Sequence, residues 1–197
     1  MVARRRGGTT LLELLLAAVL FIGISAILIT SLFAEHRFYL SSQTYIQVQW
    51  EARRALDAME RELYGSGNVR RAGDPVGGAD FAGETQVDFQ IERGFDQVAC
   101  GGICWGDETA TGRWLHVLRN ASSQLVRCST LQQADPIDFS TCRVLANYAQ
   151  TFTVDYQHSA REVRIHLRVF KASSQLPGGG MGTTPVVLTR QIRLRNS

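Results

Sequence analysis

The chain has 197 residues, a length that accommodates one or two domains. Its formal net charge of +3 equals the charge of three consecutive arginines near the start, Arg4, Arg5 and Arg6, so the rest of the chain is neutral. The basic balance therefore gives no argument for a nucleic-acid partner, and the sequence shows no internal repeat.

The first predicted element is a long apolar segment. Residues 14–34 carry no charged side chain, and about 20 apolar residues are enough to cross the hydrocarbon core of a bilayer. The arginines before the segment should stay in the cytoplasm, which places everything after Ala34 on the other side. We therefore expect a single-pass protein of the inner membrane, with a cytoplasmic N-terminus and a periplasmic C-terminal head.

Glu13 is the unusual residue of this region, because a carboxylate inside an apolar span is costly to insert. One interpretation places Glu13 at the membrane interface, where its charge suits the first turn of a helix. The other makes it a pairing group that awaits a cation. A secretory signal peptide cut near Ala26 is a rival interpretation of the segment, but the apolar run is longer than the roughly 7–15 residues of such a signal.

The order of features in residues 4–34 points to a known motif. A basic leader ends in Gly8, Glu13 follows as the fifth residue after it, and an uninterrupted apolar helix comes next. This order resembles the prepilin cleavage and methylation motif of type IV pilins and pseudopilins. Thr9 stands where the family has Phe, and Thr30 stands where many major pilins have Pro. The chain is therefore more similar to a minor pilin or a pseudopilin.

The resemblance implies how the N-terminus is processed and used. Prepilin peptidase would cut between Gly8 and Thr9, which makes residues 1–8 a leader peptide, and the new amino group of Thr9 would be a substrate for methylation. Glu13 would then act in assembly, by neutralising that amino group on an adjacent subunit.

The resemblance also implies a function and a set of partners. The chain would be a subunit of a type IV pilus or a type II secretion filament, would take part in filament initiation or the tip complex, and would not be an enzyme. Its partners would be other pilin or pseudopilin subunits, prepilin peptidase, the assembly platform protein and the inner membrane, with a cell-surface filament as the final location. Two alternatives stay open: a membrane-tethered periplasmic binding module that never polymerises, and a DNA-binding pilin for DNA uptake.

The helix is expected to continue beyond the apolar segment. Residues 9–34 form the transmembrane or filament-core part, and residues 35–64 contain no Pro or Gly and read as an amphipathic continuation. Apolar residues recur there at spacings of three and four, which predicts one buried helical stripe. The stripe consists of Tyr45, Val48, Ala52, Leu56, Met59 and Leu63. Charged residues fill the other face, the glycines at 65 and 67 end the helix, and the stripe needs a sheet to cover it.

Residues 65–197 are expected to form a β-rich head, with a loop over residues 69–85. Apolar and polar residues alternate in several short segments, which is typical of an antiparallel sheet with one wet face. These segments are residues 86–92, 113–119, 124–128, 151–156, 163–169 and 188–194. A long helix followed by such strands predicts an α+β fold, which is also the pilin-like layout.

Four cysteines lie after the apolar segment, where an oxidising compartment favours disulfides: Cys100, Cys104, Cys128 and Cys142. Of the three connectivities that four cysteines allow, we favour Cys100–Cys104 and Cys128–Cys142. The second would close a loop of about 15 residues and contribute roughly 3 kcal/mol to stability. A zinc site is the alternative, and it is disfavoured because the sequence contains no C-x-x-C pair.

No motif for catalysis, a metal or a cofactor is present. The patterns of a nucleophile elbow, a zinc protease and a phosphate loop do not occur in the sequence. The histidines are interpreted as structural; they are His36, His116, His158 and His166. Asp135 and Asp138 could bind calcium, but two carboxylates in a loop are more often turn residues. We therefore expect neither an enzyme nor a protein with a cofactor or metal.

The last two predicted strands carry a group of arginines on their polar face: Arg164, Arg168, Arg193 and Arg195. If these strands pair, the arginines could bind DNA phosphates, or acidic parts of neighbouring pilins. Four arginines make a small footprint with few aromatic residues between them, so nucleic acid is the less favoured partner.

Overall fold

The computed structural model describes residues 10–74, 77–171 and 185–195. The expected cleavage site, Gly8 and Thr9, lies outside the described residues. The chain divides into two units, one that ends at Gln43 and one that begins at Thr44.

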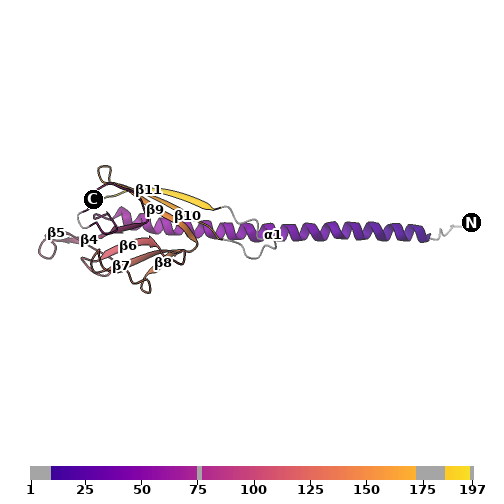
Figure 1. Ribbon diagram of the computed structural model, residues 1–197, viewed down its shortest axis with the longest axis horizontal. Coiled ribbons are helices and arrows are strands. Elements are labelled where there is room, and N and C mark those ends of the chain that lie inside the picture. Colours follow the sequence, from indigo (N-terminus) through magenta and orange to yellow (C-terminus); the bar gives the residue numbers. More distant parts are fainter. Residues whose placement is uncertain (1–9, 75–76, 172–184, 196–197) are drawn as a thin grey trace, which may run out of the picture. The chain divides into compact units, whose positions relative to one another are not determined.

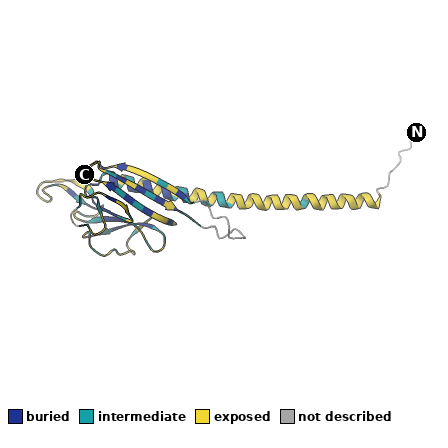
Figure 2. Cartoon of the chain, turned by 45° about the horizontal axis from the view of Figure 1, so that its top comes forward, coloured by how far each residue is buried: buried dark blue, intermediate teal, exposed yellow. Residues whose placement is uncertain are grey.

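A single helix, α1 (Leu11–Tyr64, 54 residues), contributes to both units (Figure 1). Up to Gln43 almost all of its side chains are exposed, and Figure 2 shows this part in yellow. This part is long and apolar enough to cross a membrane. The Thr30 hydroxyl donates to the carbonyl oxygens of Ala26 (3.0 Å) and Ile27 (2.9 Å), so this polar group is satisfied inside the helix.

From Thr44 onward α1 has a buried stripe, as its apolar spacing predicts. The buried residues of the stripe are Val48, Ala52, Ala55, Leu56, Met59 and Leu63. Tyr45, which we expected in the stripe, is exposed, and Ala55 joins it instead. The helix ends where expected, because Ser66 turns back on the last turn: its backbone N–H and its hydroxyl both donate to the Leu63 carbonyl oxygen.

The rest of the second unit consists of antiparallel strands in three sheets. A five-stranded sheet has the order β1-β3-β6-β7-β8, a four-stranded sheet has the order β11-β10-β9-β2, and β4 and β5 form a separate ribbon. The strands are β1 (Arg70–Arg71), β2 (Phe81–Glu84), β3 (Gln86–Phe89), β4 (Ile91–Asp96), β5 (Gly102–Gly106), β6 (Trp114–Arg119), β7 (Leu125–Thr130), β8 (Arg143–Ala146), β9 (Ala149–Gln157), β10 (Glu162–Val169) and β11 (Val186–Arg193).

One hydrophobic core joins the later turns of α1 to both larger sheets. On β10, and on β9 from Phe152 onward, every second residue faces this core, and the register places Ile165 opposite Val154 on one side and Arg190 on the other. In Figure 1 the strands β9, β10 and β11 lie beside the later part of α1. The expected α+β fold, a long N-terminal apolar helix with antiparallel sheets, is therefore present.

The structure differs from expectation in residues 69–92. The expected loop contains β1 and β2, and the expected single strand over residues 86–92 is interrupted at Gln90, so that β3 and β4 belong to different sheets. The Gln90 amide explains the interruption, because it donates to the backbone carbonyl oxygens of Gly112 (3.2 Å) and Arg113 (3.1 Å). Asp88 and Gln90 are buried rather than wet for the same reason: each has a polar partner inside the fold.

Candidate functional site

Glu13 lies in the first turn of α1, the end of a helix where a carboxylate is stabilised by the helix dipole. Its backbone N–H donates to the Thr10 carbonyl oxygen at 3.0 Å. No other acidic or basic side chain follows until Glu35. The first part of α1 is therefore an apolar helix with one negative charge at its N-terminal end.

The apolar side chains that follow Glu13 have no cover within the described part of the chain. Large apolar residues between positions 14 and 33 are exposed, among them Leu14, Leu15, Leu16, Val19, Leu20, Phe21, Ile22, Ile24, Ile27, Leu28, Ile29, Leu32 and Phe33. A contiguous apolar surface of this size marks a membrane or an interaction with other proteins.

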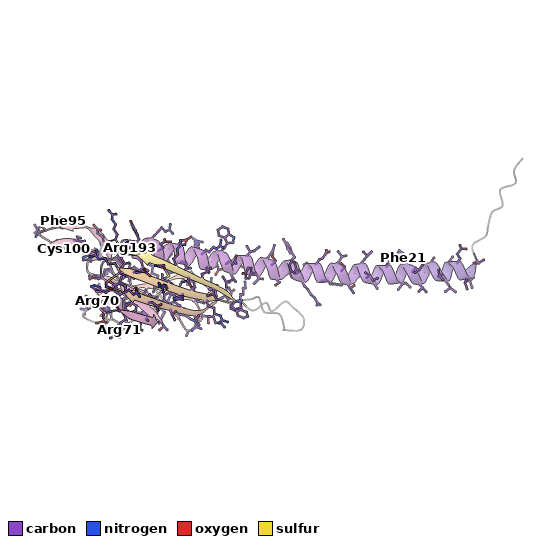
Figure 3. The ribbon with its side chains drawn as sticks, turned by 90° about the horizontal axis from the view of Figure 1, so that it is seen from above. Phe21, Arg70, Arg71, Phe95, Cys100 and Arg193 are labelled. Atoms are coloured by element: carbon purple, nitrogen blue, oxygen red, sulfur yellow. A yellow bond between two sulfur atoms is a disulfide. The ribbon has the colours of Figure 1, made fainter. Side chains whose placement is uncertain are left out.

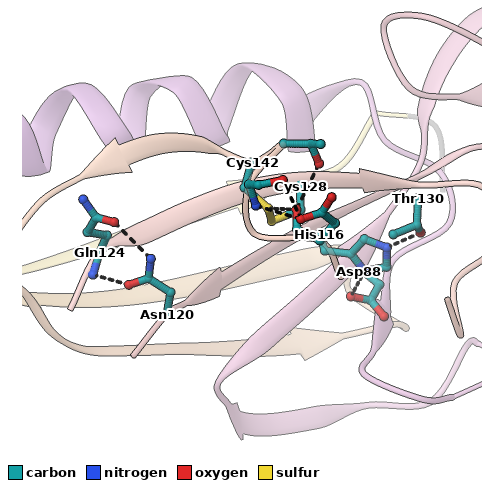
Figure 4. Close-up of a disulfide and its surroundings, with 10 residues drawn as sticks. Asp88, His116, Asn120, Gln124, Cys128, Thr130 and Cys142 are labelled. Atoms are coloured by element: carbon teal, nitrogen blue, oxygen red, sulfur yellow. Dashed lines mark hydrogen bonds and ion pairs between the residues drawn. A yellow bond between two sulfur atoms is a disulfide. The ribbon is translucent and has the colours of Figure 1, made fainter. Parts of the chain in front are cut away.

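Both favoured disulfides are present. Cys100 and Cys104 join the end of the β4–β5 turn to β5, with a Cα–Cα distance of 5.3 Å. Cys128 and Cys142 join β7 to the loop before β8, with a Cα–Cα distance of 4.4 Å (Figure 4). No cysteine is free, so the alternative of a four-cysteine zinc site is wrong.

A buried polar group that sequence reasoning missed connects β3, β6 and β7. His116 is completely buried; its Nδ1 lies 2.8 Å from Oδ1 of Asp88, and its Nε2 lies 2.6 Å from the hydroxyl of Thr130 (Figure 4). The Thr130 hydroxyl donates its only proton to the Gln132 carbonyl oxygen at 2.6 Å, so it accepts from His116. The His116 ring is therefore held on both sides, by the Asp88 carboxylate and by the Thr130 hydroxyl.

This buried group resembles the hydroxyl–imidazole–carboxylate line of hydrolases, but its chemistry differs. The Thr130 proton is committed to a backbone carbonyl, and the Asp88 carboxylate also accepts from the side-chain amides of Gln86 and Gln133. Asp88 and His116 have no exposed surface. The group therefore holds three strands together, which agrees with the interpretation of His116 as a structural histidine.

Two further buried charges are also held by the fold. Burial acts to raise the pKa of Asp107, but hydrogen bonds from the Ser129 and Thr109 hydroxyls and from the Ala110 and Thr109 backbone N–H groups outweigh it and lower the pKa to about 2. Arg127 on β7 contacts Glu62 of α1, with 2.7 Å between Nε and Oε2. Burial raises the pKa of Glu62 despite the attraction of Arg127. These contacts stabilise the head.

The arginines of the last two strands do not make a uniformly basic surface. Arg164, Arg168, Arg193 and Arg195 are all exposed, as expected, and Figure 3 labels Arg193. Two acidic residues lie next to them, however: Glu162 pairs with Arg164 at 3.2 Å and lies opposite Arg193 in the register, and Asp155 lies opposite Arg164. The mixed charge of this face gives no support for DNA binding.

The remaining candidate ligands make local contacts. Asp138 accepts from the backbone N–H and the hydroxyl of Ser140, and these hydrogen bonds lower its pKa. Asp135 accepts from the backbone N–H of Gln132 at 2.7 Å. Such contacts are typical of turn residues. Over residues 10–74, 77–171 and 185–195, no three His, Cys, Asp or Glu side chains form a group that could hold a metal ion.

Two exposed apolar features in the second unit were missed from the sequence. Trp50 lies on the outer face of α1, and Phe95 and Val98 lie at the end of the β4–β5 ribbon, where Figure 3 labels Phe95 beside Cys100. A signal for the first existed, because Trp50 falls outside the apolar stripe and among the charged residues. The ribbon gave a weaker signal, since three glycines interrupt the alternation of its strands.

Comparisons with protein-family models, curated proteins and solved structures found no match to this chain.

Proposed function

We propose that the protein is a minor pilin or pseudopilin, a subunit of a type IV pilus or type II secretion filament that takes part in filament initiation or in the tip complex. The observation that carries the proposal is the N-terminal arrangement. A leader-like segment ends in Gly8, Glu13 lies in the first turn of α1, and a charge-free apolar helix surface follows as far as Ala34.

The apolar part of α1 would have two successive surroundings. Before assembly it holds the subunit in the inner membrane, with the head in the periplasm. When the assembly machinery extracts the subunit, the helices of neighbouring subunits replace lipid around the exposed leucines and isoleucines. The exchange is between two apolar environments, so it costs little hydrophobic free energy.

Glu13 has a clear role in this scheme. Cleavage after Gly8 frees a positive amino group on Thr9, and neither this charge nor the Glu13 carboxylate is tolerated in an apolar core unless it is matched. Glu13 of one subunit pairs with the amino group of Thr9 on its neighbour. A simple membrane anchor needs no such carboxylate, so the position of Glu13 favours assembly over tethering.

The head supports the same function through its resistance to unfolding. One disulfide closes the β4–β5 ribbon, the other ties β7 to the loop before β8, and the buried Asp88–His116 contact joins β3 to β6. A subunit that works outside the cytoplasm benefits from such covalent and buried polar contacts. The stripe of α1 belongs to the core of the head. The same helix therefore supplies both the filament-core segment and part of the head.

The experiment that tests the proposal is the mass of the mature N-terminus in membrane-purified protein, alongside a Gly8→Ala variant. We expect a chain that begins at Thr9, with or without a methyl group, and an uncut leader in the variant. A chain that begins at Met1, or one cut near Ala26, would contradict the proposal and leave a tethered or secreted domain.

Glu13→Gln separates processing from assembly. The variant should be cut after Gly8 like the wild type, since the substituted residue lies beyond the cut, but its recovery in sheared filaments should fall. If Glu13→Gln were recovered in sheared filaments as well as the wild type, the proposed pairing of Glu13 with Thr9 would be contradicted.

A further inference from the structure

The end of the β4–β5 ribbon is an exposed apolar tip. Phe95 is 73% exposed and Val98 is 98% exposed, and Ile103 lies directly opposite Phe95 in the register. Single apolar residues are common on protein surfaces, but three on one short ribbon form a cluster. We call Phe95, Val98 and Ile103 the ribbon tip.

The ribbon tip is held in one conformation by its own contacts. The Cys100–Cys104 disulfide closes it, and the Asp96 carboxylate accepts from the backbone N–H groups of Val98 and Ala99, both at 2.9 Å. The backbone N–H of Cys100 donates to the Asp96 carbonyl oxygen at 3.1 Å. A surface that is ordered before binding loses little entropy when it binds.

The base of the ribbon is anchored to the end of α1. The Trp105 ring lies against Gly67, where a Cβ atom would come within 2.1 Å of it. The backbone N–H of Glu92 donates to the Gly65 carbonyl oxygen at 3.1 Å. The ribbon tip is therefore presented in a fixed position beyond the C-terminal end of α1.

A second exposed apolar feature lies on the outer face of α1. Trp50, 69% exposed, lines a shallow groove of about 770 Å³, and Ile46 is exposed one turn earlier. We call this feature the Trp50 groove. Its other lining residues are Gln47, Glu51, Arg53, Arg54, Asp57, Glu60 and Arg61.

Three acidic and three basic side chains line the Trp50 groove, and Arg190, which lies beside it, brings the formal charge of this region to +1. Two of its acidic residues, Asp57 and Glu60, form ion pairs with Arg190. Glu51 accepts from the backbone N–H and the side-chain amide of Asn147. In contrast, Arg53 and Arg54 make no ion pair with any residue that the structure describes. An apolar ring with two available cations beside it suits a ligand that is apolar and carries a negative charge.

The ribbon tip has this composition. Asp96 lies between Phe95 and Val98, and its carboxylate forms no ion pair within the described parts of the chain. Since Glu92, Arg93 and Asp96 leave the ribbon with a net negative charge, it is poorly suited to an anionic lipid surface, which attracts basic segments.

We propose that the ribbon tip of one copy binds in the Trp50 groove of a second copy. Phe95 and Val98 pack on Trp50, and the Asp96 carboxylate meets Arg53 and Arg54. This inference rests on the proposed function in one respect: it supplies a contact between heads in the assembled state.

The two surfaces are different and lie at different heights along α1. Residues 50–64 span about 21 Å at ~1.5 Å per residue, and the ribbon begins beyond them. Such a head-to-tail contact generates an open row of subunits rather than a closed dimer. A single ribbon covers far less than the roughly 800 Å² per partner of a stable interface. The contact therefore needs copies that are concentrated by the membrane or by the filament.

The test is cross-linking between two differently tagged full-length copies in the same membranes. One copy carries Val98→Cys at the tip and the other carries Gln47→Cys in the groove, and a short bismaleimide joins them without disturbing the native disulfides. We expect a product that carries both tags. Val187→Cys, an exposed residue on β11, replaces Val98→Cys as the matched control and should give no such product.

Three variants test the chemistry of the contact. Trp50→Ala in the Gln47→Cys copy, or Phe95→Ala in the Val98→Cys copy, should lower the yield about tenfold, the effect of losing a central aromatic anchor. Asp96→Asn keeps the oxygen that accepts from Val98 and Ala99 but removes the charge, and should lower the yield by a smaller factor. All substituted side chains are exposed, so the fold should persist.

The N-terminal mass, measured in the same membranes, separates the two proposals. A cut at Thr9 without the two-tag product, or with a product that Trp50→Ala and Phe95→Ala leave unchanged, would overturn the contact and leave the pilin proposal intact. A specific product from a chain with an intact leader would support the contact and contradict the pilin proposal. A product of the Val98→Cys copy with some other protein only would overturn the second copy as the occupant.

Discussion

The two parts of α1 show what decides whether an apolar helix face is covered by its own chain. From Leu14 to Ala34 the helix is apolar on all sides and its large side chains are exposed, whereas from Thr44 onward one apolar stripe is buried and charged residues occupy much of the rest of the surface. The second part is amphipathic because a sheet covers one side and water meets the other. The first part has no polar side, so its cover must come from lipid or from other chains.

The same substitution, leucine to alanine, should have different effects on stability in the two parts of α1. Leu63 is fully buried in the core of the head, whereas Leu28 is exposed. Leu63→Ala should lower the free energy of unfolding of the head by about 2–5 kcal/mol, because it removes apolar contacts and leaves a cavity. Leu28→Ala should leave it unchanged. Urea unfolding of the full-length protein in detergent, followed by tryptophan fluorescence, measures both.

The outcome for Leu28→Ala is as informative as that for Leu63→Ala. Leu28→Ala should instead reduce recovery in sheared filaments, since it alters a surface that other chains cover. Equal losses of head stability for the two variants would mean that the first part of α1 belongs to the folding unit of the head, and the contrast between the two parts would fail.

Acid should destabilise the head but not the first part of α1, because the buried carboxylate of Asp107 is in the head. Its pKa of about 2 lies below the 3.8 of an unperturbed aspartate. A lowered pKa stabilises the folded state above pH 3.8, and this contribution is lost as the pH falls toward 2. We expect a loss of about 2 kcal/mol over this window, estimated from the difference between the two pKa values.

Asp107→Asn is the control for the acid experiment. The variant should be less stable at neutral pH and should lose the part of the pH dependence that lies between pH 4 and pH 2. Circular dichroism in detergent should show that the helix signal of residues 11–43 persists while the head loses stability. An unchanged acid profile in Asp107→Asn would show that other groups control the acid response.

The sequence predicted the elements whose signals are local. Spacings of three and four marked the buried stripe of α1, alternation marked β9 and β10, and the separation of 14 residues between Cys128 and Cys142 favoured their disulfide. The stripe was misjudged at Tyr45, because a tyrosine at helical spacing fits a buried or an exposed position equally well. Local patterns do not show where the covering sheet ends.

The features that sequence reasoning missed depend on contacts between distant residues. Asp88 was expected on a wet face because it alternates with Val87 and Phe89, yet His116, 28 positions away, makes its burial favourable. The β4–β5 ribbon was missed for a different reason. Gly94, Gly101 and Gly102 have φ angles of +128°, +68° and +150°, which only glycine adopts readily, and they replace the alternation that would mark the strands.

The smallest predicted effect concerns how the head holds α1. Arg190, on the edge strand β11, pairs with Glu60 (2.7 Å from Nε) and Asp57 (3.2 Å from Nη2) of the helix. All three side chains are more than a third exposed, so water screens their attraction. Arg190→Ala should cost under about 1 kcal/mol, and the cost should shrink further in high salt.

A double-mutant cycle of Arg190→Ala with Asp57→Ala, by the same urea unfolding, isolates the coupling from the loss of side-chain packing. If the coupling free energy were as large as the loss of unfolding free energy in Leu63→Ala, ion pairs rather than the buried stripe would hold the helix on the sheet. A charged face alone would then be enough to hold α1 on the sheet, without an apolar stripe. The amphipathic pattern from Thr44 onward would no longer explain why this part of the helix is covered while the earlier part is not.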